Sequence, residues 1–146
     1  MGAAFDYLVS AKLETETEYP YKAVNQKCKY VESEGKVGDK GHENVETNKV
    51  DQLKAAIAKG PVSVAIEADT MVFQFYSGGV LNSKSCGTNL DHGVVAVGYG
   101  NDGKQDYYIV RNSWGASWGE SGYIRIAAVD GEGICGIQMA PVVPRE

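Results

Sequence analysis

Several features are missing from this sequence, and each absence excludes a class of function. No two lysines or arginines are adjacent, and the formal net charge is −5. Because phosphate binding needs clustered cations, the sequence predicts no nucleic-acid partner. No apolar stretch approaches the roughly 18 residues of a membrane-spanning helix, and the first residues match neither a signal peptide nor a myristoylation motif. No membrane partner is therefore expected.

Residues that bind metals are also scarce. The 146 residues include three cysteines and two histidines, and no two cysteines form a C-x-x-C pair. This pattern predicts neither a structural zinc site nor any other metal, and we expect no cofactor. The odd number of cysteines leaves two alternatives open, a reactive thiol within the chain or a cysteine partner outside it.

Two helices are predicted in the first 60 residues. Residues 2–12 carry apolar side chains at helical spacing, and the polar run that follows ends this helix before a proline. Residues 22–47 are polar and contain several glycines, which indicates a loop with short strands. Asn48 resembles the N-terminal cap of a second helix, which Gly60-Pro61 ends. The apolar faces of the two helices are Ala4, Phe5, Leu8 and Val9, and Val50, Leu53 and Ile57.

The sequence after Pro61 is typical of β-strands. Four runs rich in β-branched and aromatic residues are bounded by Gly, Asp or Asn: residues 62–68, 93–98, 107–111 and 122–126. Short strands that follow one another closely favour an antiparallel sheet or barrel. With helices early and strands late, the predicted fold class is α+β.

One glycine-rich segment matches the G-x-G-x-x-G fingerprint of dinucleotide sites, residues 98–103 with the sequence GYGNDG. Such a site also needs a helix directly after the glycines, because the N-terminus of that helix holds the pyrophosphate. Here a strand is predicted next, and Asp102-Gly103 is a strong hairpin-turn signal. We therefore predict a β-hairpin at this position and no nucleotide site.

Two segments in the second half contain residue types that catalytic sites use. The first is Leu90-Asp91-His92-Gly93, which leads directly into a predicted strand. The second is RNSWGASWGE, residues 111–120. Each segment alone has an ordinary structural interpretation, since a strand-end histidine, a turn asparagine and packed tryptophans are common. Their occurrence together, in this order, is more specific.

In this order the two segments resemble the papain and cathepsin L family of cysteine proteases. In that family Asp-His-Gly or Asp-His-Ala precedes a V-x-V-G-Y-G strand, and N-S-W-G-x-x-W-G-E-x-G-Y follows after a hairpin. Here the second motif runs from Asn112 to Tyr123 without a gap. Further matches extend over almost the whole chain: Tyr19-Pro-Tyr21, GPVSVAI at residues 60–66, Tyr76-Ser-Gly-Gly79 and Cys135-Gly-Ile137.

The resemblance assigns roles to three residues. His92 is expected to be the catalytic acid and base, Asn112 to orient its imidazole, and Trp114 to shield their hydrogen bond from water. In a Cys–His protease a thiolate attacks the peptide carbonyl, and the imidazole keeps the thiol ionised and later protonates the leaving amine. The asparagine takes the orienting role that aspartate has in serine triads. The expected substrate is a polypeptide.

The family's nucleophile segment, C-G-x-C-W, has no counterpart in this sequence. In the family it lies roughly 130–150 residues before the histidine and asparagine, whereas only 91 residues precede His92. The nucleophile is therefore expected roughly 40–60 residues before Met1, and the oxyanion-hole glutamine also lies upstream. We expect the chain alone to be inactive, with an upstream segment or another chain supplying the thiol.

The resemblance also assigns the three cysteines. Cys86 and Cys135 match the pair that the family joins across the end of its barrel. Cys28 matches a structural cysteine whose partner lies upstream of this chain. Since Cys28 stands in a polar loop without the Gly-x-Cys-Trp context, we do not expect it to act as the nucleophile.

The resemblance implies that residues 1–146 are a partial papain-like peptidase domain. Residues 45–143 would form the right lobe, an antiparallel β-barrel, and residues 1–44 a remnant of the helical left lobe. That remnant should expose apolar surface unless the missing N-terminal segment or another chain covers it. The family's usual location is lysosomal, vacuolar or secreted. The alternative function is a catalytically inactive papain-like module that serves as a structural or protein-binding component.

The resemblance finally implies a specificity pocket, which receives the substrate side chain two residues before the cut. Four residues match its lining: Met1, Ala65, Leu90 and Ala140. None of the four is charged and two are alanine, so the pocket should be roomy and apolar. We expect a preference for Leu, Phe or Val over charged residues at that substrate position.

Overall fold

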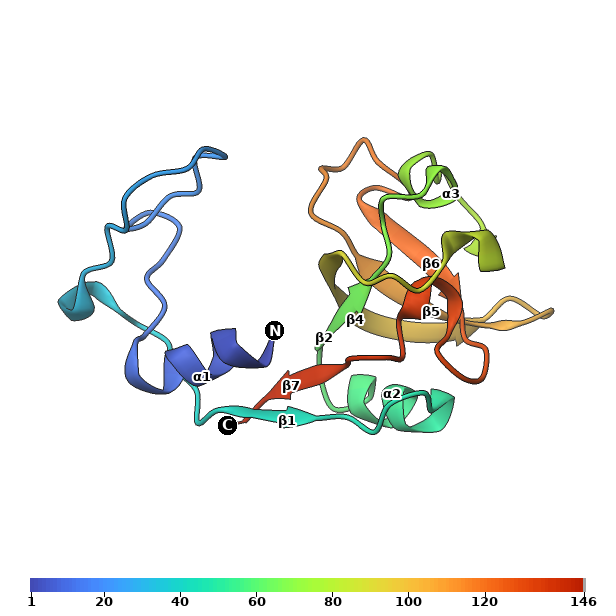
Figure 1. The fold of residues 1–146 in the computed structure, drawn as a ribbon, viewed down its shortest axis with the longest axis horizontal. Coiled ribbons are helices and arrows are strands. Elements are labelled where there is room, and N and C mark those ends of the chain that lie inside the picture. Colours follow the sequence, from blue (N-terminus) through green and yellow to red (C-terminus); the bar gives the residue numbers. More distant parts are fainter. Residues whose placement is uncertain (146) are drawn as a thin grey trace. The chain divides into compact units, whose positions relative to one another are not determined.

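The computed structural model describes residues 1–145 (Figure 1). It divides into two compact units. The first comprises Met1–Glu43 with the C-terminal residues from Pro144, and the second comprises Asn44–Val143. Each unit is described by itself.

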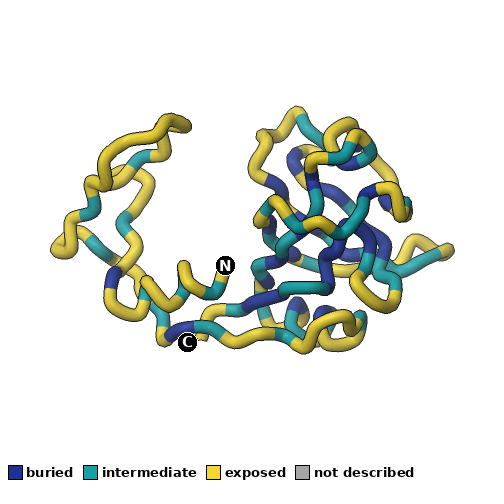
Figure 2. The backbone as a smooth tube through the Cα atoms, in the orientation of Figure 1, coloured by how far each residue is buried: buried dark blue, intermediate teal, exposed yellow. Residues whose placement is uncertain are grey.

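The first unit has little regular structure and almost no core. Its helix α1 spans Gly2–Ser10 and ends at Ala11, where the backbone becomes extended, two residues before the predicted end. A 3-10 turn, η1, covers Glu32–Glu34. No residue of α1 is fully buried, and of its predicted apolar face Phe5 and Leu8 are half-buried while Ala4 and Val9 are exposed. Among the described residues of this unit, only Ala11 and Gly41 are buried, and most of it is yellow in Figure 2.

The second unit is built on a sheet whose strand order is β1-β7-β2-β4-β5-β6-β3. Strands β1 and β7 each contain residues of both units. The strands are β1 His42–Asn44, β2 Val62–Ile66, β3 Val80–Leu81, β4 His92–Asn101, β5 Asp106–Arg111, β6 Tyr123–Ala127 and β7 Val142–Pro144.

The four predicted strands are confirmed as β2, β4, β5 and β6, each within a few residues of its expected bounds. β4 pairs antiparallel with both β2 and β5, and β5 pairs antiparallel with β6. The short strand β3 was not predicted, and it joins β6 in parallel. Helices and strands in this arrangement fit the predicted α+β class.

Helix α2 spans Val50–Ile57 and packs Leu53 and Ile57 into the core, as the apolar spacing predicts. The cap prediction is wrong by one residue, because Lys49 occupies the N-cap position without a side-chain cap. Asn48 instead has a positive φ of 60°, a conformation that asparagine tolerates better than most residues. Its backbone N–H donates to the carbonyl oxygen of Gln138 at 2.8 Å. The remaining short helices are α3 Met71–Gln74, η2 Lys84–Cys86 and η3 Ile134–Gly136.

In the core of the second unit, a buried tyrosine of β5 pairs with a buried glutamine that follows η3. Tyr108 and Gln138 are fully buried, and the tyrosine hydroxyl donates to Gln138 Oε1 at 2.8 Å. The Gln138 amide nitrogen donates in turn to the carbonyl of Gly131 at 2.6 Å. Burial raises the pKa of Tyr108 far above its ordinary value, so the phenol stays neutral. Because the tyrosine hydroxyl and the glutamine amide are both hydrogen-bonded, these bonds offset the cost of burying them and anchor β5.

The glycine-rich segment forms the end of β4 and the predicted hairpin turn into β5. Asp102 Oδ1 accepts from the backbone N–H groups of Lys104 and Gln105, both at 2.9 Å. At Gly100 a Cβ atom would lie 2.7 Å from the Tyr107 hydroxyl on the neighbouring strand. This glycine therefore permits close cross-strand packing.

Within residues 1–145, no helix is long and apolar enough to cross a membrane, and no three His, Cys, Asp or Glu side chains are grouped as metal ligands.

Candidate active site

The hairpin of β4 and β5 brings His92 and Asn112 to the same end of the sheet. His92 is the first residue of β4, and Asn112 directly follows the last residue of β5. Because the strands are antiparallel, with Val95 opposite Arg111, the start of β4 lies beside the end of β5. His92 is also opposite Ile66 of the buried strand β2. Two strands of regular geometry therefore fix the histidine backbone.

A hydrogen bond joins the two side chains, with His92 Nε2 at 2.9 Å from Asn112 Oδ1. The backbone N–H of Ser113 donates to the same atom at 2.8 Å, which identifies it as the amide oxygen. Since that oxygen only accepts, Nε2 must carry the proton. Nδ1 of His92 makes no hydrogen bond to the described residues, so it is the ring nitrogen left for another partner. Asn112 is 8% exposed, and its amide nitrogen has no partner within the described part of the chain.

Trp114 lies against the His92 imidazole. Its ring stacks on the His92 imidazole with centroids 5.2 Å apart and planes 27° apart. Phe73 and Trp118 contact Trp114 edge to face, at 5.4 and 5.3 Å. The indole nitrogen of Trp118 donates to the carbonyl of Gln74 at 3.0 Å. The imidazole thus has a fixed aromatic cover on one face, although Trp114 itself remains 40% exposed.

Glu120 supports the loop that carries Asn112 and Trp114, a role that sequence reasoning missed. Its carboxylate accepts two hydrogen bonds from the Arg125 guanidinium, at 2.9 and 2.7 Å. It also accepts from the backbone N–H of Gly79 at 2.9 Å. These bonds hold the pKa of Glu120 below its usual range, with the Arg125 bonds as the main cause. Glu120 is the last residue of the N-S-W-G-x-x-W-G-E motif, and its place in that motif could have indicated this role from the sequence.

We expect Glu120→Gln to lower the free energy of unfolding at pH 7 by about 1–2 kcal/mol, because a charge-assisted bidentate pair is lost. The pKa of Glu120 is depressed in the folded state, so its contribution is present above about pH 4.3 and disappears as the pH falls through the folded-state pKa. Urea unfolding should therefore separate the two proteins at pH 7, and the difference should shrink as the pH falls below the ordinary pKa of glutamate. The exposed Glu46, changed to Gln, is the matched control. An equal difference at neutral and at acidic pH would contradict the charge-based explanation.

The structure places three of the four predicted pocket residues in the second unit. Ala65 lies on β2 opposite Gly93, next to His92 in the register. Leu90 lies two residues before His92, and its side chain reaches the backbone of Gly136, where an added Cβ atom would come within 2.7 Å of it. Ala140 follows η3 on the same segment as Gly136. Met1 lies at the start of α1, in the first unit.

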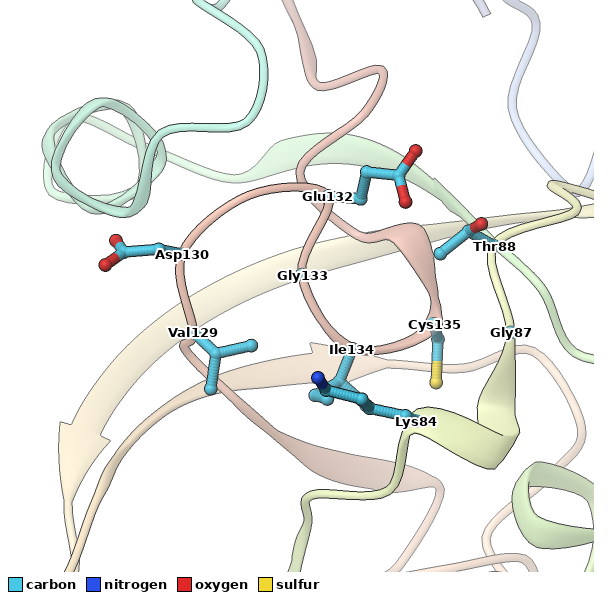
Figure 3. Close-up of a pocket in the computed structure, with 9 residues that line it drawn as sticks. All are labelled: Lys84, Gly87, Thr88, Val129, Asp130, Glu132, Gly133, Ile134 and Cys135. Atoms are coloured by element: carbon cyan, nitrogen blue, oxygen red, sulfur yellow. The ribbon is translucent and has the colours of Figure 1, made fainter.

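The predicted disulfide is confirmed, since Cys86 in η2 and Cys135 in η3 are bonded. Both cysteines are buried, whereas Cys28 in the first unit is an exposed free thiol. Beside the disulfide lies a cavity of about 290 Å³ (Figure 3). The loop at Gly87 and Thr88 forms part of its wall, and none of His92, Asn112 and Trp114 lines it.

Comparison with known proteins identifies the family. The sequence profile of the papain family of cysteine proteases matches residues 1–145. The chain belongs to the papain family. It is 49% identical to the oryzain beta chain of Oryza sativa subsp. japonica and 46% identical to the cysteine proteinase RD21A of Arabidopsis thaliana. Each comparison covers 99% of this chain and 32% of the relative, so the chain spans about a third of these papain-family proteins.

Solved structures of papain-family proteases show the same fold. Bromelain from Ananas comosus, solved with the E64 inhibitor, is 38% identical with a TM-score of 0.89, over 99% of this chain and 68% of bromelain. A digestive procathepsin L 3 from the larval midgut of Tenebrio molitor is 40% identical with a TM-score of 0.93, over 100% of this chain and 48% of that one. This papain-family chain corresponds to the C-terminal part of the peptidase domain.

Proposed function

We propose that this chain supplies the histidine and asparagine of a papain-like cysteine endopeptidase, and that a segment upstream of Met1 supplies the nucleophile. The observation that carries the proposal is the hydrogen bond from His92 Nε2 to Asn112, which leaves Nδ1 without a partner among the described residues. A Cys–His protease needs this arrangement, with one ring nitrogen held by an orienting group and the other facing the thiol.

The proposed reaction uses His92 as acid and base in turn. The thiol of the upstream cysteine gives its proton to Nδ1 of His92, and the resulting thiolate attacks the peptide carbonyl. The imidazolium then protonates the leaving amine, which breaks the peptide bond and leaves an acyl-enzyme. His92 next removes a proton from water, and the water oxygen attacks the thioester carbonyl. The C–S bond breaks, the acid product leaves, and the imidazolium returns its proton to the sulfur, which restores the thiol. Asn112 keeps the ring in the same orientation through these steps.

None of the three cysteines of this chain is proposed as the nucleophile. Cys86 and Cys135 are bonded to each other. Cys28 is a free thiol, but it stands in a polar segment without the family's C-G-x-C-W context. We therefore propose that the chain alone does not hydrolyse peptides.

We propose that the same upstream segment covers the first unit. This unit buries almost nothing, and it exposes large apolar side chains that include Tyr7, Val9, Leu13, Val24 and Val37. Exposed apolar surface of this density is typical of a region that packs against another polypeptide. Within this proposal residues 1–44 are part of the left lobe and residues 45–143 form the right lobe.

We propose a lysosomal, vacuolar or secreted location. The disulfide between Cys86 and Cys135 is buried, and such bonds persist in oxidising compartments. One relative, 47% identical, is named as a KDEL-tailed cysteine endopeptidase, from Arabidopsis thaliana.

These proposals can be tested by supplying the missing upstream segment, which gives a completed enzyme. The upstream part of a papain-family relative, including its C-G-x-C-W segment, is fused in front of Met1 or expressed together with this chain. A fusion in which that cysteine is replaced by serine is the matched control. Cysteine-dependent peptide hydrolysis supports the proposed function, whereas a stable complex without hydrolysis supports the binding-module alternative.

We expect the completed enzyme to prefer Leu, Phe or Val over charged residues two positions before the cut. The proposed pocket of Met1, Ala65, Leu90 and Ala140 contains no charged side chain to pair with Arg, Lys or Asp. Because one methylene group in an apolar pocket is worth only about 1–3 kcal/mol, the preference among apolar side chains should be graded, with charged side chains well below all of them. A peptide library varied at this position measures it. A preference for Arg or Asp would show that the pocket is wrongly assigned.

A further inference from the structure

Asp91, directly before His92, is hydrogen-bonded to the end of β2 through both its backbone and its side chain. The backbone N–H of Asp91 donates to the Ile66 carbonyl at 3.0 Å, and the N–H of Ala68 donates to Asp91 Oδ1 at 2.8 Å. On the other side, the N–H of Glu67 donates to the carbonyl of Cys135 at 2.9 Å. The residues from 66 to 68 therefore hold both the approach to His92 and the segment of η3.

The side chain of Glu67 enters this arrangement from the same position. Its Oε2 atom accepts a hydrogen bond from the backbone N–H of Asn89, three residues before His92. The contact joins residues 22 positions apart in the sequence. A carboxylate that binds a backbone N–H forms a charge-assisted hydrogen bond, which is stronger than one between neutral groups. Glu67 thereby constrains the loop between Cys86 and Leu90.

Gly87 provides a second, independent indication that this carboxylate is accommodated by the loop. Any Cβ atom at Gly87 would overlap with the Glu67 carboxylate group, and the glycine has a positive φ of 74°. The loop therefore leaves room for the carboxylate at Gly87 and directs the Asn89 N–H toward it. Gly87 also lines the cavity in Figure 3.

We propose that Glu67 is a positioning residue of the active site, which acts through Asn89 on Leu90 and His92. The disulfide holds the loop at Cys86, and Asp91 is held by its bonds to Ile66 and Ala68, so between these two anchors the Glu67 carboxylate holds the loop at Asn89. Leu90 is one residue beyond Asn89 and belongs to the proposed substrate pocket. Glu67 therefore sets the shape of that pocket and the approach of the chain to His92. The effect on substrates rests on the proposed function, whereas the effect on the loop does not.

The first test uses the chain by itself and needs no activity. In Glu67→Ala, amide hydrogen exchange at Asn89 should be about tenfold faster or more, and the NMR signals of the Leu90 methyl groups and the His92 ring should move. Signals of Val110 and Ile124, in the core of the sheet, should stay in place. Glu67→Gln keeps an acceptor oxygen and should restore the wild-type pattern. The exposed Glu46→Ala is the matched control.

Glu67→Asp keeps the charge but withdraws it by one methylene group, so it should reproduce the local changes of Glu67→Ala even if the alanine variant does not fold. Unchanged Asn89 exchange and Leu90 signals in the aspartate variant, or equal changes throughout the sheet, would overturn the proposal. In the completed enzyme, the ratio of kcat/KM for leucine over valine two residues before the cut should change at least threefold in Glu67→Asp. An unchanged ratio in an active enzyme would overturn the proposed effect on the pocket. If the completed enzyme is inactive, the proposed function fails while the result on Asn89 stands.

Discussion

Replacing His92 by alanine in the completed enzyme should lower kcat/KM for peptide hydrolysis by about 10⁴-fold or more. The imidazole both ionises the thiol and protonates the leaving amine, so its removal affects every step of the proposed reaction. The residual rate should come from substrate binding alone. Steady-state kinetics with a fluorogenic peptide measures the difference.

His42 provides the matched control, because it is the only other histidine of the chain. Its Nδ1 atom lies 2.8 Å from Asp6 Oδ1 in the first unit. In the proposed mechanism it has no catalytic role, so His42→Ala should change kcat/KM by no more than a few-fold. A loss for His42→Ala as large as that for His92→Ala would show that the decrease reflects folding and not catalysis.

Replacing both Cys86 and Cys135 by alanine should lower the free energy of unfolding of the chain by about 4 kcal/mol. The bond closes a loop with a sequence separation of 49 residues. Removing it raises the conformational entropy of the unfolded chain, which lowers the free energy of unfolding by about 4 kcal/mol. It also releases η2 from η3 beside Leu90 and the strand that begins with His92. Urea unfolding of the unreduced protein gives the comparison.

Cys28→Ala is the control for the disulfide, since an exposed thiol should contribute within about 0.5 kcal/mol. Thiol titration of the unfolded, unreduced chain should find one reactive group at most. Three reactive groups, or equal stability with and without the cysteine pair, would contradict the disulfide in the protein as isolated.

The main strands of the second unit could be predicted from the sequence because each strand has its own local pattern of apolar residues. The runs that predict β2, β4, β5 and β6 alternate or are continuously apolar, and glycine or asparagine marks their ends. The Asp102-Gly103 turn brings two of these strands together as a hairpin, which places His92 beside Asn112. The resemblance to the papain family added the pairing of Cys86 with Cys135.

Features that depend on contacts distant in sequence were not predictable in the same way. Asn48 looked like a helix cap, but its N–H donates to Gln138, 90 positions later, and the helix begins without a side-chain cap. The parallel pairing of β3 with β6 needs a two-residue strand that carries no pattern. Glu67 was included in a predicted strand, and nothing local connects its side chain with Asn89.

The first unit shows the limit of pattern analysis most clearly. The helical spacing of residues 2–12 predicted α1, yet spacing alone does not tell whether an apolar face has a partner. Of the predicted face, Val9 remains 57% exposed and Ala4 is exposed, while Phe5 and Leu8 are half-buried. The same spacing in α2 leads to full burial of Leu53. The difference lies in the sheet that packs against α2, which a helical pattern does not reveal.

The central claim is that His92 and Asn112 form part of a Cys–His site that an upstream thiol completes. Its most direct test compares peptide hydrolysis by three samples: the chain alone, the upstream segment alone, and the two combined. We expect turnover only in the combined sample, and we expect the loss of this turnover when the upstream cysteine is replaced by serine. Cysteine-dependent turnover by the pure chain alone would contradict the claim and would make Cys28 a candidate nucleophile.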